Sequence, residues 1–108
     1  MSASEHIPLL RRLLTIADKM VDDRTIDISD ATLRQLKGEI KLQRLRVDVT
    51  HGLIDYEATC LIETIAELAY ARSERSERRE QRAIMYINSL TCFMWSDLRA
   101  AEKRLAAS

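Results

Sequence analysis

The stretch RSERSERREQRAIMYINSLTCFMW, residues 72–95, places a highly charged segment directly before the most apolar segment of the chain. From Leu53 to the C-terminus there is neither Gly nor Pro, so no helix breaker interrupts this half of the sequence. A single helix of that span would be on the order of 80 Å long. Because a chain of 108 residues is expected to fold compactly, we predict that the segment folds back between Ser73 and Ser76.

Apolar residues recur at helical spacing on both sides of this predicted break. The face before it comprises Ile54, Ala58, Leu61, Ile62, Ile65, Leu68 and Ala69, and the face after it comprises Ile84, Ile87, Met94, Leu98, Ala101 and Leu105. Two helices are therefore predicted, over residues 53–73 and 80–105.

Two further helices are predicted in the first half of the chain, over residues 8–22 and 30–47, from apolar residues at the same spacing. Pro8 is expected to open the first helix, because the first helical position needs no amide hydrogen. Ser29 is expected to cap the second, with Ile28 and Leu33 at the positions of a hydrophobic staple. The chain is expected to turn between residues 47 and 53, at Gly52.

The composition agrees with an all-α fold. Apolar residues make up 46% of the chain and charged residues 31%, with two Gly and one Pro. We therefore predict a single domain over residues 1–108, folded as a small antiparallel bundle of three or four helices. A chain of this size gains from a second subunit that covers apolar surface, so a homodimer is expected.

The net charge and the cysteines indicate in which cellular compartment the protein is expected. Lys plus Arg and Asp plus Glu number 17 each, so the net charge gives no overall attraction to nucleic acid or to an anionic membrane. No apolar run approaches the roughly 18 residues of a membrane span, and the N-terminal residues do not form a signal peptide. Cys60 and Cys92 lie in no metal-binding or redox spacing. We expect a cytoplasmic protein with free thiols and no membrane association.

The charged segment separates its charges when it is treated as one helix. Arg72, Arg75, Arg78, Arg79 and Arg82 fall within an arc of about 120 degrees, and Glu74, Glu77 and Glu80 fall on an opposite arc. One interpretation is an electrostatic docking strip for phosphates or for an acidic protein surface, because Arg makes forked contacts to both. The other interpretation is a solvated connector. A second basic stripe is predicted on the helix at 30–47, from Arg34, Lys37, Lys41 and Arg44.

The apolar segment that follows is apolar nearly all round. Beyond the core positions, the side chains that point elsewhere are Met85, Tyr86, Leu90, Phe93 and Trp95. A helix of this kind must be covered on most of its circumference. These five residues are therefore predicted to form a partner or dimer interface, where aromatics and Met are enriched. The alternative is that this is the central helix of a four-helix monomer.

No catalytic or metal-binding constellation is apparent. Glu63 and Glu67 lie one turn apart, on the face opposite Leu61 and Ile65. Together with Tyr56, Cys60 and Tyr70 they are expected to point to water or to a partner rather than to an internal metal. His6 and His51 have no nucleophile or carboxylate in a recognisable spacing. We predict no catalytic residue, no metal and no cofactor.

Three functions fit these features. The first is a non-enzymatic regulatory protein that binds a protein partner through helical surfaces, as an antagonist or antiactivator of a transcription regulator, an immunity protein or a chaperone does. The second is a small nucleic-acid-binding protein that uses the basic stripes. The third is a helical enzyme whose site is assembled between chains. The surplus of apolar helical surface and the zero net charge favour the first.

Overall fold

The described residues form four α-helices. The structure is a computed structural model, and it describes residues 2–26, 28–44 and 52–107. The helices are α1 (Ser2–Asp22), α2 (Asp30–Arg44), α3 (Gly52–Ser73) and α4 (Glu77–Ala107). The residues described form no β-strand. The prediction of an all-helical fold is confirmed.

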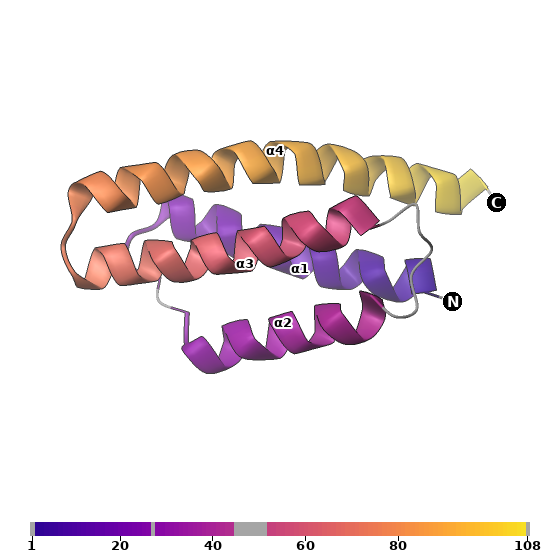
Figure 1. Ribbon diagram of the computed structural model, residues 1–108. Helices are drawn as coiled ribbons and strands as arrows, with labels where there is room; N and C mark the ends of the chain where they lie inside the picture. Colours follow the sequence, from indigo (N-terminus) through magenta and orange to yellow (C-terminus); the bar gives the residue numbers. More distant parts are fainter. Residues whose placement is uncertain (1, 27, 45–51, 108) are drawn as a thin grey trace.

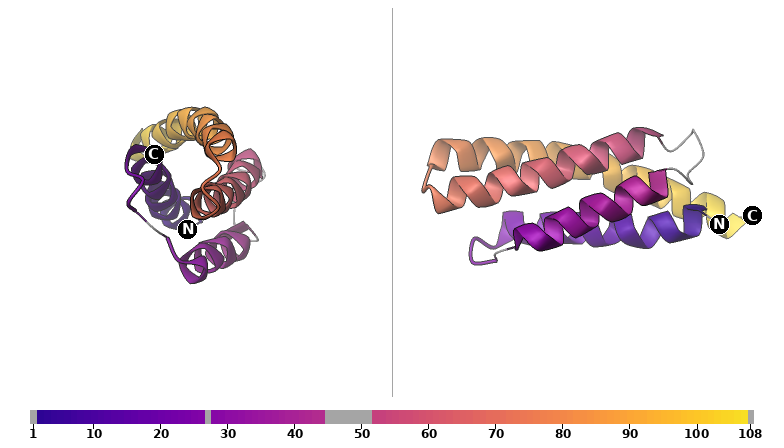
Figure 2. Two further views of the ribbon diagram at one scale, coloured as in Figure 1. Left: turned by 90° about the vertical axis from the view of Figure 1, so that its left-hand side faces the viewer. Right: turned by 60° about the horizontal axis from the view of Figure 1, so that its bottom comes forward.

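The helices lie lengthwise beside one another, and successive helices run in opposite directions (Figure 1). Viewed along the helices, α1 and α3 lie in the middle, with α4 on one side of them and α2 on the other (Figure 2). The molecule measures 47 × 24 × 20 Å. The long helix α4 packs against both α3 and α1, whereas α2 packs against α1 and α3.

The core is built by the stripes that the helical periodicity predicts. Each helix turns one apolar side inward, and burial of that side drives the association of the helices. The fully buried large side chains are Leu13, Leu14 and Met20 of α1, Leu36 of α2, Leu61, Ile65 and Leu68 of α3, and Ile87 and Leu98 of α4.

The first helix begins earlier than predicted. It starts at Ser2, and Pro8 lies inside it rather than at its first position. A proline inside a helix removes one backbone hydrogen bond. However, Ile7 is buried on the same side as Leu10 and Leu14, so packing favours a helix that extends beyond Pro8 towards the N-terminus. The prediction that Pro8 opens the helix is therefore wrong.

The start of α2 agrees with the predicted cap. The Ser29 hydroxyl accepts a hydrogen bond from the Thr32 amide at 3.2 Å, which satisfies one of the free amides of the first turn. Ile28 is partly buried against the core and Leu33 is buried in it. The predicted helix end at residue 47 and most of the predicted turn lie outside the described residues. After them, α3 begins at Gly52, one residue earlier than predicted.

The predicted break between Ser73 and Ser76 is confirmed, and its geometry is well defined. The Ser76 amide donates to the Ala71 carbonyl at 2.9 Å, and the Arg75 amide donates to the Arg72 carbonyl at 3.2 Å. These two bonds are those of a Schellman motif, in which the residue after the cap adopts a left-handed conformation. That residue is Arg75, with φ of 55°. Helix α4 then begins at Glu77, three residues earlier than predicted.

None of the helices within the described ranges combines the length and the apolar character needed to cross a membrane. Cys60 is half-buried and Cys92 is exposed, and both are free thiols.

Candidate functional site

Exposed large apolar side chains are concentrated on α3 and α4. Five such residues are exposed among the described side chains, and their exposed fractions are Tyr56 69%, Tyr70 51%, Met85 71%, Tyr86 63% and Phe93 67%. Isolated exposed apolar residues are common on protein surfaces, but a group of them on neighbouring elements is a candidate interaction surface. The described parts of α1 and α2 contribute none of these residues.

Helical register places four of the five on one side of the molecule. Tyr56 and Tyr70 lie on the outer side of α3, and Tyr86 and Phe93, seven residues apart, share the flank of α4 that adjoins α3. Met85 lies about 100 degrees away from Tyr86 around α4 and belongs to a different surface. We call the shared surface the α3–α4 face and define it by Tyr56, Cys60, Glu63, Glu67, Tyr70, Arg79, Arg82, Tyr86 and Phe93.

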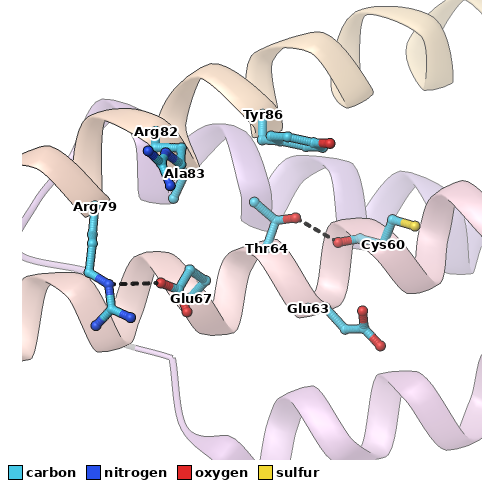
Figure 3. A pocket seen from close by; sticks show the side chains of 8 residues that line it. All are labelled: Cys60, Glu63, Thr64, Glu67, Arg79, Arg82, Ala83 and Tyr86. Carbon is cyan, nitrogen blue, oxygen red and sulfur yellow. Dashed lines mark hydrogen bonds and ion pairs between the residues drawn. The ribbon is translucent and has the colours of Figure 1, made fainter.

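A pocket of about 400 Å³ lies at the centre of the α3–α4 face (Figure 3). Its walls come from α3 and α4, and it is lined by Cys60, Glu63, Thr64, Glu67, Arg79, Arg82, Ala83 and Tyr86. The Thr64 hydroxyl donates to the Cys60 carbonyl at 2.8 Å, so this polar group is satisfied within α3. Figure 3 shows the Tyr86 ring above Thr64 and Cys60, and Arg79 reaching from α4 towards Glu67.

The charges of this surface are divided between its two helices. The acidic residues Glu63 and Glu67 lie on α3, and the basic residues Arg79 and Arg82 lie on α4. Arg79 Nε is 3.7 Å from Glu67 Oε1, and the Arg79 guanidinium carbon is 5.6 Å from the centre of the Tyr70 ring. This stacking holds the guanidinium beside the aromatic ring. Arg82 is exposed and has no ion pair within the described residues.

Glu63 connects the face to α2. Its Oε1 is 3.6 Å from Lys37 Nζ. About half or more of each carboxylate side chain is exposed, 62% for Glu63 and 49% for Glu67. The predicted outward direction of the two carboxylates is therefore confirmed. They face solvent and basic side chains, which is the arrangement of a surface rather than of an internal metal site.

The ionisation of Tyr56 links it to the same surface. A side-chain hydrogen bond to Cys60 raises the pKa of Tyr56, and the neighbouring Tyr86 and Glu63 raise it further. Tyr56 is therefore a neutral phenol at physiological pH. Its hydroxyl is engaged with Cys60, and its exposed ring supplies apolar area of the kind that aromatic residues bring to protein contacts.

The predicted interface residues of α4 divide into two groups. Tyr86, Phe93 and Met85 are exposed, whereas Leu90 and Trp95 are partly buried against the core. Trp95 Nε1 donates to Asp18 Oδ2 at 3.0 Å, so this indole is engaged with α1. The expectation that Trp95 is free for a partner is wrong, because α1 covers the side of α4 on which it lies.

The predicted basic strip from Arg72 to Arg82 is not continuous. Arg72 lies in the last turn of α3, Arg75 lies in the turn between the helices, and Arg78, Arg79 and Arg82 belong to α4, so the assumed single helical register does not exist. Arg72 is nearly buried, and its Nε donates to Glu80 Oε2 at 2.9 Å. Glu80 is itself buried, whereas the single-helix treatment had placed it on the arc opposite the arginines. The assignment of Arg72 to a docking strip is therefore wrong.

The second basic stripe is only partly described. Arg34 is exposed, and Lys37 is half-exposed and paired with Glu63. The side chains of Lys41 and Arg44 lie outside the described ones. The side chains of His6 and His51 also lie outside them. Among the described residues no group of three or more His, Cys, Asp or Glu residues could hold a metal ion.

The sequence predicted that the outward residues of α3, Tyr56 and Tyr70 among them, point to water or to a partner. It did not join them to the predicted interface, which contained residues of α4 only. What joins the two helices is the side-by-side packing that follows the turn at Arg75 (Figure 1). No family model, no curated protein and no solved structure matches this chain.

Proposed function

We propose that this chain is a non-enzymatic regulatory protein that binds a protein partner through the α3–α4 face. The observation that supports this proposal most is the grouping of Tyr56, Tyr70, Tyr86 and Phe93 on two adjacent helices, each at least half exposed. Aromatic side chains supply large apolar area at a small cost in conformational entropy, and those that become desolvated carry most interface energy, at about 2 kcal/mol or more each.

The charges around the aromatic residues suit a protein partner of mixed charge. Glu63, Glu67, Arg79 and Arg82 place two negative and two positive groups on the same face. Polar groups of both signs at the rim of an apolar contact contribute specificity and association rate more than affinity. We place this function in the cytosol, because a reducing compartment suits two free cysteines.

Binding of nucleic acid has less support. A phosphate backbone favours a continuous set of unpaired Lys and Arg side chains. Here Arg72 is nearly buried against Glu80, Arg79 is beside Glu67, and Lys37 is beside Glu63. Carboxylates of the same chain lie beside three members of the predicted basic stripes, so the local positive potential that attracts a phosphate backbone is reduced.

An affinity capture from the source cell tests this function. Three baits are compared: the wild-type chain, a double variant with Tyr86→Ala and Phe93→Ala, and a matched control with Met85→Ala. Met85 is an exposed apolar residue on the same helix but outside the α3–α4 face. We expect a specific protein to be retained by the wild-type chain and by the control, to be lost with the double variant, and to survive nuclease treatment.

Retention by the double variant at the wild-type level would contradict the proposed surface. Loss of the retained protein on nuclease treatment would instead favour nucleic acid as the primary ligand. A further check is the ionic strength of the wash, since contacts through aromatic residues weaken only modestly between 50 and 200 mM salt, whereas contacts to 6–10 phosphates lose about a thousandfold or more in affinity.

A further inference from the structure

The α3–α4 face is complementary to itself. Its acidic groups, Glu63 and Glu67, lie on one helix, and its basic groups, Arg79 and Arg82, lie on the other. All four line the same pocket, so they occupy the same level along the two helices (Figure 3). The 3.7 Å separation of Arg79 from Glu67 fixes this level directly. On a surface with this pattern, the acidic groups of one copy can face the basic groups of a second copy at the same level.

We infer that the occupant of this face is a second copy of the chain, related by a two-fold axis that runs parallel to α3 and α4. Rotation about such an axis keeps every residue at its level and exchanges the two sides of the face. The acidic side of α3 in each copy then meets the basic side of α4 in the other. This inference rests on the proposed protein-binding role of the face and adds the identity and orientation of the partner.

The charge pattern distinguishes this arrangement from the other symmetric one. A two-fold axis perpendicular to the helices would place α3 on α3 and α4 on α4. Centred on the pocket, it would bring Glu63 of one copy towards Glu63 of the other and would likewise oppose the two Arg82 side chains. Like charges that face each other across an interface are unfavourable, so the parallel axis is selected.

The apolar groups fit the same arrangement. Tyr56 and Tyr86 are close enough across the face for Tyr86 to influence the pKa of Tyr56. With the parallel axis, the α4 aromatics of one copy pack over the Tyr56 end of α3 in the other copy. Offset contacts between aromatic rings stabilise such an interface beyond the apolar area that they bury.

The size of the face suits a weak dimer. The face runs from Tyr56 to Tyr70 along α3, a length of about 21 Å, and two adjacent helices are about 20 Å wide. The footprint is therefore roughly 420 Å² per copy, or about 840 Å² in total, which lies below about 1,200 Å², where weak and transient associations are found.

Charge reversal tests the orientation. One variant reverses the basic side through Arg79→Glu and Arg82→Glu, and the second reverses the acidic side through Glu63→Arg and Glu67→Arg. The control for the first variant is Arg78→Glu with Arg99→Glu. It makes the same change of net charge as that variant, on exposed parts of α4 outside the face. Dimer dissociation constants are measured by sedimentation equilibrium over micromolar concentrations, with circular dichroism to verify helix content.

We expect the wild type and the control to dimerise and each reversal to weaken its own dimer by about tenfold or more. A mixture of the two reversed variants should form a mixed dimer, because each then meets opposite charges on both helices, and this restoration also shows that both variants are folded. A wild type that stays monomeric at high micromolar concentration would overturn the inference. Reversed variants that dimerise like the wild type would overturn it equally, since the perpendicular axis predicts that outcome.

The two proposals fail separately. A monomeric wild type that still captures a protein through Tyr86 and Phe93 leaves the regulatory function standing and removes the second copy as the occupant. A dimer with the expected charge dependence, but without any other captured protein, supports the inference and removes the regulatory function.

Discussion

Glu80 of α4 accepts a hydrogen bond from Arg72 of α3 at 2.9 Å, and both side chains are almost withdrawn from solvent, with exposures of 5% and 12%. Arg24, between α1 and α2, approaches the second oxygen of the same carboxylate at 2.8 Å. A single buried carboxylate therefore holds three segments together at the end of the molecule where α3 turns into α4. The guanidinium Nη1 and Nη2 of Arg72 are buried without a hydrogen-bond partner among the described residues.

Neutralising Glu80 should therefore be costly. Glu80→Gln leaves the buried guanidinium of Arg72 without its opposite charge, and we expect the free energy of unfolding to fall by on the order of 3 kcal/mol. Glu77→Gln makes the same chemical change one turn earlier at an exposed position, and it should cost less than about 1 kcal/mol. Urea unfolding followed by circular dichroism measures both. Equal effects of the two variants would show that burial of the pair has no energetic consequence.

Arg75 offers the opposite case, a substitution that should stabilise. Its left-handed backbone, with φ of 55°, is unfavourable for any residue with a Cβ, by roughly 1–2 kcal/mol. Arg75→Gly removes this cost but gives the unfolded chain more freedom, so we expect a net gain of about 0.5–1 kcal/mol. Arg99→Gly, in the exposed middle of α4, should lose about 1 kcal/mol. A loss of stability in Arg75→Gly would indicate that the arginine side chain itself stabilises the turn.

Trp95 should act in folding rather than in binding. Trp95→Phe keeps most of the apolar ring but removes the hydrogen bond to Asp18, and we expect the free energy of unfolding to fall by about 1–2 kcal/mol. Phe93→Ala, at an exposed position, should change it by no more than about 0.5 kcal/mol. Dimerisation and partner capture should show the reverse order, with Phe93→Ala the more damaging. A Trp95→Phe chain that is stable but unable to bind would contradict the intramolecular role.

The raised pKa of Glu57 should make the free energy of unfolding depend on pH. Burial raises the pKa of Glu57 above its ordinary value of 4.5, and the neighbouring Asp97 raises it further. Its Oε2 has no hydrogen-bond partner within the part of the chain that the structure describes. The folded state thus binds this proton more tightly than the unfolded chain does. The stability that this preference contributes is complete at pH below about 4.5 and is lost as the pH rises through the raised value.

Glu57→Gln should accordingly be more stable than the wild type at pH 7, and this advantage should shrink towards pH 4. The gain should stay below about 1 kcal/mol, because the side chain is only half-buried and water screens its charge. Asp97→Asn, which removes the neighbouring charge, should give a smaller gain of the same sign at pH 7. Thermal unfolding at the two pH values provides the comparison, and an advantage that is independent of pH would exclude this explanation.

Local sequence was sufficient for the features that depend on neighbours in the chain. The apolar spacing located four helices, and Ser29 identified the start of α2. The turn near Ser73 followed because the segment without Gly or Pro is too long to stay a single helix in a compact chain. Pro8 was misplaced because burial of Ile7 outweighs the preference of proline for a first turn. Each of these features is set within about one or two helical turns, where periodicity and capping operate.

The sequence by itself determined that the chain is helical, which sides of the helices are apolar, and that α4 carries more apolar surface than one core can cover. Tertiary structure alone decided which parts of that surface are covered and which stay exposed. The turn at Arg75 changes the helical register, which buries Arg72 and Glu80 and leaves Arg79 and Arg82 outside. Packing of α1 covers Trp95, while Tyr86 and Phe93 stay exposed beside the outward residues of α3. The reason is physical: periodicity fixes the direction of a side chain on its own helix, but only the neighbouring helices determine whether that direction leads to protein or to water.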